Sequence, residues 1–145
     1  MLPDAIELVI VTPEKQLLRE KVADVQMPGE NGYLGILPGH APLMTGLGIG
    51  ELSYRDPSGK ETALVAIVRG FAEVLSDRVT VLAETAERAE EIDLQRAKDA
   101  LARAEKRLTS NDPNIDWDRA NIALQRALIR IQVATKRRSA LVSGS

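Results

Sequence analysis

The first half of the chain alternates apolar and polar residues with a period of two. In AIELVIV, Ile6, Leu8 and Ile10 fall on one face, and the later runs ALVAIV, FAEVL and RVTVLAE are similarly short and apolar. KVADVQM breaks strict alternation between Val22 and Val25, which indicates a bulge or bend. A period of two is typical of half-buried strands rather than of helices.

Turn-forming residues separate several of these runs. Asp56-Pro57-Ser58-Gly59 suits a type I turn, because Pro presets the backbone at the second position and Gly permits the exit. Ser76-Asp77 suits a tight hairpin turn between FAEVL and RVTVL. Short strands joined in this way predict an antiparallel sandwich or barrel over residues 1–85.

Near Ala86 the period changes to that of an amphipathic helix. Apolar residues recur at spacings of three and four in two segments: Leu94, Ala97, Leu101, Ala104 and Leu108, then Trp117, Ala120, Leu124, Ala127 and Ile131. Asp93 and Asp116 stand at N-cap positions, and Ser110-Asn111-Asp112-Pro113 interrupts the pattern between them. The short break predicts an antiparallel two-helix hairpin over residues 86–145 and an α+β chain overall. We expect Trp117 to pack either in the core or in the hairpin.

The two helical segments repeat one sequence. IDLQRAKDALARAEKR begins at Ile92 and IDWDRANIALQRALIR begins at Ile115, which is 23 residues later. At about 100° per residue, each copy places three arginines within about 60° of one another beside its alanines. These two stripes are Arg96, Arg103 and Arg107, and Arg119, Arg126 and Arg130. In a folded hairpin the stripes can converge on one anion, and in an opened hairpin they form a basic rail.

The expected seam between the helices consists of small residues. Ala97, Ala100 and Ala104 face it from one helix, and Ala120, Ala123 and Ala127 from the other. Alanines bury little apolar area, so at about 25 cal/mol per Å² the hairpin is expected to be weakly held and able to open. As one rod, residues 93–138 would span about 70 Å.

Charge is distributed unevenly along the chain. Residues 1–85 carry 7 Lys/Arg and 12 Asp/Glu (7 − 12 = −5), whereas residues 86–145 carry 12 and 9 (12 − 9 = +3). From Arg119 onward there are six cations and no acid, which favours contact with an acidic surface, a phosphate ligand or nucleic acid. Two structural explanations stay open: a solvated helix face, and ion pairs four residues apart such as Asp99 with Arg103.

Composition excludes several classes of function. The chain has no Cys and one His, His40, so a thiolate metal site, a disulfide framework and a Cys-His or Ser-His-Asp centre are not indicated. No apolar run reaches the roughly 20 residues of a membrane span, and MLPDAIELVIV lacks the basic start of a signal peptide. These features predict a soluble or peripheral protein of a reducing compartment, without a catalytic or metal site.

One further motif lies between predicted strands. Gly35-Ile36-Leu37-Pro38-Gly39-His40-Ala41-Pro42 is dense in turn formers, but no Gly-Lys-Ser/Thr follows it, so it is not a phosphate loop. We expect a buried loop in which His40 is hydrogen-bonded. Aromatic residues are too few for base stacking, which argues against a single-strand nucleic-acid binder.

Several segments of the chain, together with the predicted C-terminal hairpin, resemble the epsilon subunit of the bacterial and chloroplast F-type ATP synthase. The resemblance covers essentially the whole length of the chain. The resemblance rests on VTPEKQL, on GYLGILPGHAPLMTGLGIGEL from Gly32 to Leu52, on Gly70-Phe71-Ala72-Glu73-Val74, and on AERAEEIDLQRA from Ala86 to Ala97. One departure is Val68-Arg69-Gly70-Phe71, where the family usually has a second Gly before the Phe.

The resemblance implies a non-catalytic rotor subunit. Its N-terminal β-sandwich, residues 1–85, would hold the gamma subunit and sit on the ring of c subunits. Its C-terminal hairpin, residues 86–145, would extend along gamma and restrain ATP hydrolysis through Arg119, Arg126 and Arg130, which would contact an acidic segment of a beta subunit. The expected location is peripheral, on the cytoplasmic side of the bacterial plasma membrane or the stromal side of the thylakoid, without membrane insertion.

Some members of the family also bind ATP on the folded hairpin, without magnesium, through an Ile/Leu-Asp-x-x-Arg-Ala motif. The corresponding residues here are Ile92, Asp93, Arg96 and Ala97, and the further ATP-contacting positions fall on Glu87, Arg103, Arg126 and Arg130. Two hypotheses therefore stand side by side: a structural and inhibitory rotor subunit that requires no cofactor, and an ATP-sensing module in which regulatory ATP holds the hairpin shut. A basic nucleic-acid adapter is a third, which a steeply salt-dependent interaction with DNA would support.

Overall fold

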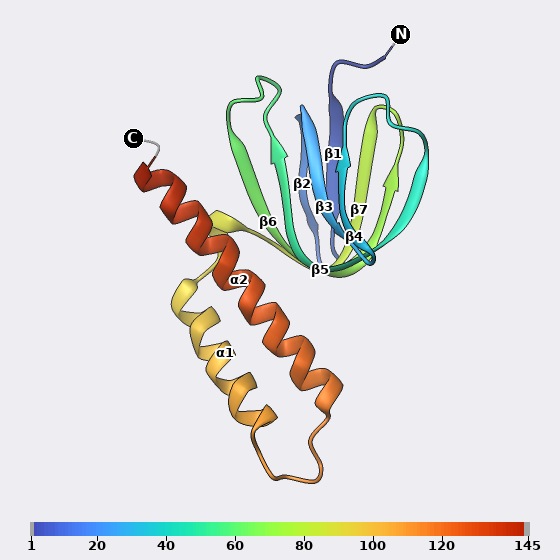
Figure 1. Cartoon of the computed structure of the whole chain (residues 1–145). Coiled ribbons are helices and arrows are strands. Elements are labelled where there is room, and N and C mark those ends of the chain that lie inside the picture. Colours follow the sequence, from blue (N-terminus) through green and yellow to red (C-terminus); the bar gives the residue numbers. More distant parts are fainter. Residues whose placement is uncertain (1, 144–145) are drawn as a thin grey trace. The chain divides into compact units, whose positions relative to one another are not determined.

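The computed structural model describes residues 2–143. The chain divides into two compact units, Met1–Arg88 and Ala89–Ser145. The first unit contains all of the strands and the second contains all of the helices, in the order in which Figure 1 colours them. The α+β prediction of strands followed by a two-helix hairpin is confirmed.

Seven strands form one continuous hydrogen-bonded ladder in the order β2-β1-β7-β6-β5-β3-β4. Their bounds are β1 Ile6–Val11, β2 Gln16–Val22, β3 Asp24–Gly29, β4 Gly32–Ile36, β5 Leu43–Arg55, β6 Thr62–Val74 and β7 Arg78–Arg88. Neighbouring strands are antiparallel as predicted, except that β1 pairs with β7 in parallel. The predicted bend between Val22 and Val25 is the point where the chain leaves β2, at one edge of the ladder, for β3 near the other.

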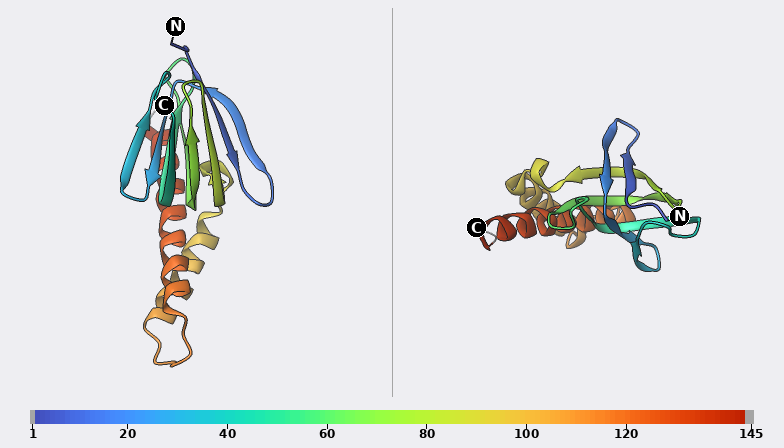
Figure 2. Two further views of the ribbon diagram at one scale, coloured as in Figure 1. Left: turned by 90° about the vertical axis from the view of Figure 1, so that its right-hand side faces the viewer. Right: turned by 90° about the horizontal axis from the view of Figure 1, so that it is seen from above.

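The ladder bends over so that both of its edges share one core. Leu18 of β2 and Ile36 of β4 lie in strands at opposite edges, yet both belong to the same buried cluster. Ile6, Leu8 and Ile10 of β1 are fully buried in this cluster, which confirms the period-two pattern. Figure 2 shows that the strands curve rather than lie in one plane. One layer folded onto itself in this way is a sandwich, because its apolar faces meet inside.

The long strand β6 joins two runs that the sequence shows as separate. ALVAIV and FAEVL belong to one 13-residue strand, which passes through Arg69 and Gly70. Arg69 has φ 47 and Gly70 has φ 151, and both values lie in the region that favours glycine. The departure Val68-Arg69-Gly70-Phe71 therefore places a non-glycine residue in a conformation that would suit a second Gly. The Arg69 side chain pairs across the ladder with Glu84 at 3.0 Å.

Strand β7 extends beyond the predicted domain boundary at residues 85 and 86. Its last residues, from Thr85 to Arg88, pair with β6 residues from Val68 to Val65. These backbone pairs continue the ladder, so the change of period near Ala86 precedes the end of the strand. The unit boundary falls between Arg88 and Ala89.

Both predicted turns are present. The N–H of Gly59 donates to the carbonyl of Asp56 at 2.8 Å, and the N–H of Leu75 donates to the carbonyl of Arg78 at 2.8 Å. In the first turn the Ser58 hydroxyl donates to the Asp56 carboxylate, as do the N–H groups of Glu61 and Lys60. These hydrogen bonds favour the ionised carboxylate and hold the pKa of Asp56 below its ordinary value.

The prediction that the loop from Gly35 to Pro42 is buried is wrong. Only Ile36 is buried there, and Leu37 is 63% exposed. The loop lies on the surface because its irregular backbone has few partners, although the N–H of Gly39 donates to the carbonyl of Ser76 at 2.7 Å. His40 is hydrogen-bonded as expected, since its Nδ1 lies 2.6 Å from the carbonyl oxygen of Ala41.

The second unit contains a short 3₁₀ helix η1, Ala89–Glu91, and two α-helices, α1 Leu94–Leu108 and α2 Trp117–Ser143. Asp93 and Asp116 cap them as predicted: each Oδ1 accepts from a backbone N–H three residues later, at 3.1 Å, from Arg96 and Arg119 respectively. Figure 1 shows α2 running back along α1, with the connecting segment at one end. Within residues 2–143, no helix is both long enough and apolar enough to cross a membrane.

We predict that Gly70→Ala destabilises the first unit by about 2 kcal/mol or more, because the local backbone suits only glycine. A Cβ at this position would lie 2.0 Å from the carbonyl oxygen of Leu82 and 2.8 Å from the Cα of Ala83. Equilibrium denaturation, followed by the backbone amide signals of the strands, measures the loss. Gly35→Ala is the matched control, since nothing lies within 4 Å of a Cβ there. Equal stability of the two variants would contradict this account of Gly70.

Candidate functional site

The two long helices meet along a seam of alanines. Ala97 and Ala104 of α1 and Ala120 and Ala127 of α2 are each at most 3% exposed. Ala100 and Ala123, at the edge of this alanine seam, are half-buried. The seam predicted from the spacing is therefore confirmed. Since an alanine contributes one methyl group, the seam brings the helices close together while each alanine buries little apolar surface. Two larger residues of α2, Ile129 and Val133, are also buried.

An arginine-lined groove runs beside the alanine seam. It has a volume of about 440 Å³, and its charged lining consists of Arg96, Arg103, Arg107, Arg119, Arg126 and Arg130. We call these six residues the arginine groove. Three come from α1 and three from α2, so the repeated stripes converge on one side of the hairpin as the sequence predicted. No acidic residue lines it.

The groove carries positive charge with little internal compensation. Among residues 2–143, the side chains of Arg96, Arg103, Arg107, Arg119 and Arg126 make no hydrogen bond or ion pair. The ion pair between Asp99 and Arg103, one of the alternatives that the sequence left open, is absent among the described residues, and the Asp99 carboxylate accepts from Gln95 Nε2 at 3.0 Å. Cations that lack partners in one groove repel each other, and an anion bound among them would relieve that repulsion.

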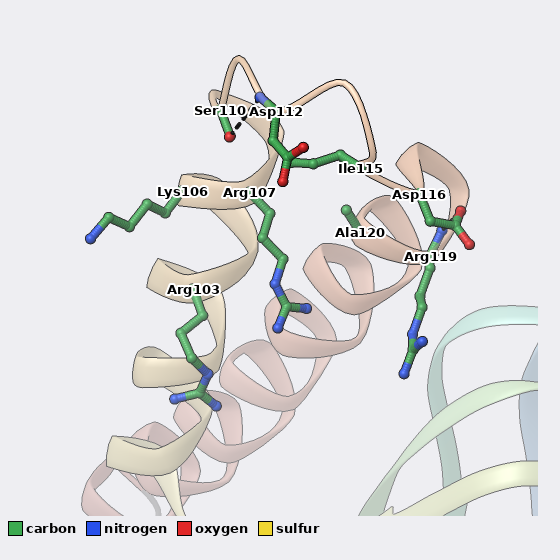
Figure 3. Close-up of a pocket in the computed structure, with 9 residues that line it drawn as sticks. All are labelled: Arg103, Lys106, Arg107, Ser110, Asp112, Ile115, Asp116, Arg119 and Ala120. Atoms are coloured by element: carbon green, nitrogen blue, oxygen red, sulfur yellow. Dashed lines mark hydrogen bonds between the residues drawn. The ribbon is translucent and has the colours of Figure 1, made fainter.

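A second cavity, of about 640 Å³, adjoins the groove near the turn between the helices. It shares Arg103, Arg107 and Arg119 with the arginine groove, and its other polar lining residues are Lys106, Ser110, Asp112 and Asp116. In Figure 3 the guanidinium groups of Arg103 and Arg107 extend in the same direction along α1, whereas Lys106 points away from α2. Lys106 lies outside the repeated arginine stripes, and the sequence pattern marked Ser110 only as part of the break between the helices.

Two acidic residues at this end of the hairpin accept hydrogen bonds from backbone N–H groups. Asp112 Oδ1 accepts from the N–H of Asn114 at 2.9 Å, and Asp116 Oδ1 accepts from the N–H of Arg119 at 3.1 Å. The Ser110 hydroxyl accepts from the N–H of Asp112 at 3.1 Å (Figure 3). These hydrogen bonds fix the turn and the start of α2, so both carboxylates act as turn and cap residues rather than as partners of the arginines.

The residues predicted to contact a nucleotide fall into three groups. Arg96, Arg103, Arg126 and Arg130 line the arginine groove together. Ile92 and Ala97 are buried, at 8% and 0% exposure, and Asp93 is the N-cap of α1. Glu87 lies on β7 in the first unit. The motif Ile-Asp-x-x-Arg-Ala therefore has a local structural explanation, in which only its arginine side chain lines the groove.

The prediction that Trp117 packs in the core or in the hairpin is wrong. It is 52% exposed in the first turn of α2. The described residues also contain no group of three His, Asp or Glu side chains that could hold a metal ion.

Both units match family models. Residues 5–89 match the model described as ATP synthase, Delta/Epsilon chain, beta-sandwich domain, and residues 90–135 match ATP synthase, Delta/Epsilon chain, long alpha-helix domain. The chain is 48% identical over 136 residues to the ATP synthase epsilon chain of Solibacter usitatus, covering 94% of this chain and 100% of that one. It is 50% identical over 133 residues to the epsilon chain of Syntrophobacter fumaroxidans, covering 92% and 98% respectively.

Solved structures with the same fold include parts of two mitochondrial complexes. One is a chain of the Euglena gracilis mitochondrial ATP synthase OSCP/F1/c-ring assembly, with a TM-score of 0.79, 26% identity and coverage of 93% of this chain and 84% of that one. The other comes from the central stalk and c-ring of the Tetrahymena thermophila mitochondrial ATP synthase, with a TM-score of 0.56. At 17% identity, the second match shows the fold alone.

We predict that Asp116→Ala lowers the stability of the hairpin by about 1 kcal/mol, because α2 loses its N-cap acceptor. Hydrogen exchange of the α2 backbone amides, read against those of the strands, measures the change. Asp116→Asn keeps a side-chain acceptor and is expected to retain most of the protection. If the two variants exchange at the same rate, the cap does not stabilise the hairpin.

Proposed function

Since this chain belongs to the ATP synthase delta/epsilon chain family, as an epsilon subunit of an F-type ATP synthase, we propose that it restrains ATP hydrolysis from the central stalk through its C-terminal hairpin. As an epsilon chain it is a non-catalytic subunit of that complex. Its role is therefore to bind other subunits and to change conformation.

The proposed partners of the first unit are the gamma subunit and the ring of c subunits. The match to the Euglena chain, which belongs to an assembly with F1 and a c-ring, supports this proposal at 26% identity. The proposed location is peripheral, at the cytoplasmic face of a bacterial plasma membrane. The bacterial sources of its relatives support that choice.

The observation that carries the inhibitory role is the basic surface of α2. Arg119 and Arg126 are exposed, Arg130 is half-buried, and the neighbouring sequence from Asn121 to Ser145 contains no acid. An acidic segment of a beta subunit would be attracted to this surface once α2 is presented to it. The alanine positions support presentation by opening, because each of them buries only one methyl group.

We predict that removing residues 89–145 raises ATP hydrolysis by the assembled complex several-fold while leaving assembly intact. The deletion starts after β7, so the ladder of the first unit stays complete. Hydrolysis is measured at low ATP and without a proton gradient, where restraint by the hairpin is expected to be strongest. Unchanged hydrolysis in a fully assembled complex would refute the inhibitory role.

Point variants separate the basic contact from the rest of the hairpin. Arg119→Ala removes one proposed beta-subunit contact without touching the residues proposed for a nucleotide. It is expected to relieve part of the inhibition, whereas Lys98→Ala, an exposed cation of α1 outside the groove, is expected to relieve none.

A second proposed function is sensing of ATP by the folded hairpin. The supporting observation is that Arg96, Arg103, Arg126 and Arg130 line one groove, which suits a triphosphate. Residues of both helices would hold such a ligand, so its binding would favour the folded hairpin over the open one. ATP would then relieve inhibition, and the proposed site requires no magnesium.

We predict that Arg126→Ala abolishes ATP binding to the isolated chain, because the phosphates lose a charged partner from α2. Isothermal titration calorimetry in the absence of magnesium measures the affinity. Lys98→Ala removes one positive charge from α1 outside the groove and is expected to bind ATP as the unmodified chain does. Retention of full affinity by Arg126→Ala would rule out this site.

A further inference from the structure

The arginine groove contains more arginines than the proposed nucleotide site uses. That set uses Arg96, Arg103, Arg126 and Arg130, which leaves Arg107 and Arg119 in the same groove without a role in it. The cavity of about 640 Å³ toward the turn shares Arg103, Arg107 and Arg119, so the two cavities adjoin. A ligand that follows the whole path would therefore extend past the nucleotide site to the turn.

The positive charge of the arginine groove is dense, and the extension toward the turn is also lined by Asp112 and Asp116, whose carboxylates accept hydrogen bonds from backbone N–H groups. Arg107 follows Arg96 by 11 residues, so the α1 stripe spans about 16 Å at about 1.5 Å per residue. The facing α2 stripe spans the same 11 residues from Arg119 to Arg130, so six charges share that length. This corresponds to one positive charge for about every 3 Å of groove.

Charge spacing discriminates between the polyanions that fit such a groove. Acidic residues on one face of an extended peptide lie about 7 Å apart, which is too sparse to neutralise the groove. Nucleic-acid strands have closely spaced phosphates, but their bases gain affinity from aromatic stacking, and no aromatic residue lines either cavity. A linear polyphosphate carries a charge on every phosphate and has no side groups to accommodate.

We propose that the arginine groove and its extension toward the turn bind linear inorganic polyphosphate of more than three phosphates. Arg96 and Arg130 would hold one end, Arg103 and Arg126 the middle, and Arg107 and Arg119 the end nearer the turn. Guanidinium groups suit this ligand because each donates two hydrogen bonds to phosphate oxygens. The proposal requires neither inhibition of the parent complex nor ATP binding.

The test is calorimetry on the isolated full chain, without magnesium and at fixed ionic strength. The probes are tripolyphosphate and a longer linear polyphosphate. We expect the longer chain to bind at least about tenfold more tightly, because it reaches charged donors that tripolyphosphate does not. Equal affinities for the two probes would overturn the proposal.

The variant Arg107→Ala/Arg119→Ala removes the additional contacts. This double variant should lose about tenfold or more in affinity for the longer polyphosphate. Its affinity for tripolyphosphate should fall by no more than about threefold, because the other four arginines still bind that shorter ligand. Arg107→Lys/Arg119→Lys keeps both charges and should recover most of the affinity, which separates a binding defect from a folding defect.

The matched control is Lys98→Ala/Arg138→Ala, which removes two exposed cations of the same helices that line neither cavity. If this control loses as much affinity as the groove variant, binding is nonspecific attraction to net charge and the proposal is wrong. If polyphosphate binds as expected while ATP does not, the proposal stands and only the ATP-sensing function fails.

Discussion

The close contact of α1 and α2 through alanine determines most of what the second unit can do. Because Ala97, Ala104, Ala120 and Ala127 bring no bulk to the seam, the helix backbones approach closely and the arginines at its edge face one groove. The same small side chains bury little apolar area, so they stabilise the hairpin weakly. Larger side chains in the seam would hold the helices more firmly and move the two arginine stripes apart.

Much of this arrangement could be predicted from the sequence, because it depends on local periodicity. The spacing of three and four residues fixed both the alanine seam and the arginine stripes, and Asp93 and Asp116 marked the helix starts by their N-cap chemistry. The alternating strand pattern of Ile6, Leu8 and Ile10 could also be predicted, since alternation follows directly from burial of one face of a strand.

Features that depend on contacts between distant segments could not be predicted in the same way. The parallel pairing of β1 with β7 and the joining of two apolar runs into β6 through Arg69 and Gly70 arise from the ladder as a whole. The surface position of the loop from Leu37 to Pro42 likewise depends on partners such as Ser76. The spacing allowed an ion pair between Asp99 and Arg103, four residues later. Gln95 is equally close, four residues earlier, and it is the residue that donates a hydrogen bond to the Asp99 carboxylate.

Pro113 limits the shape that an opened hairpin can take. Its ring has no N–H to donate and would collide with the carbonyl of Thr109 in a continuous helix. The segment from Thr109 to Asp116 instead has hydrogen bonds of its own, including the cap on α2. The helices would therefore separate as two stiff arms of about 22 and 40 Å joined by an elbow, not as a single straight shaft. Where α2 can reach is then determined by the angle of that elbow as much as by helix length.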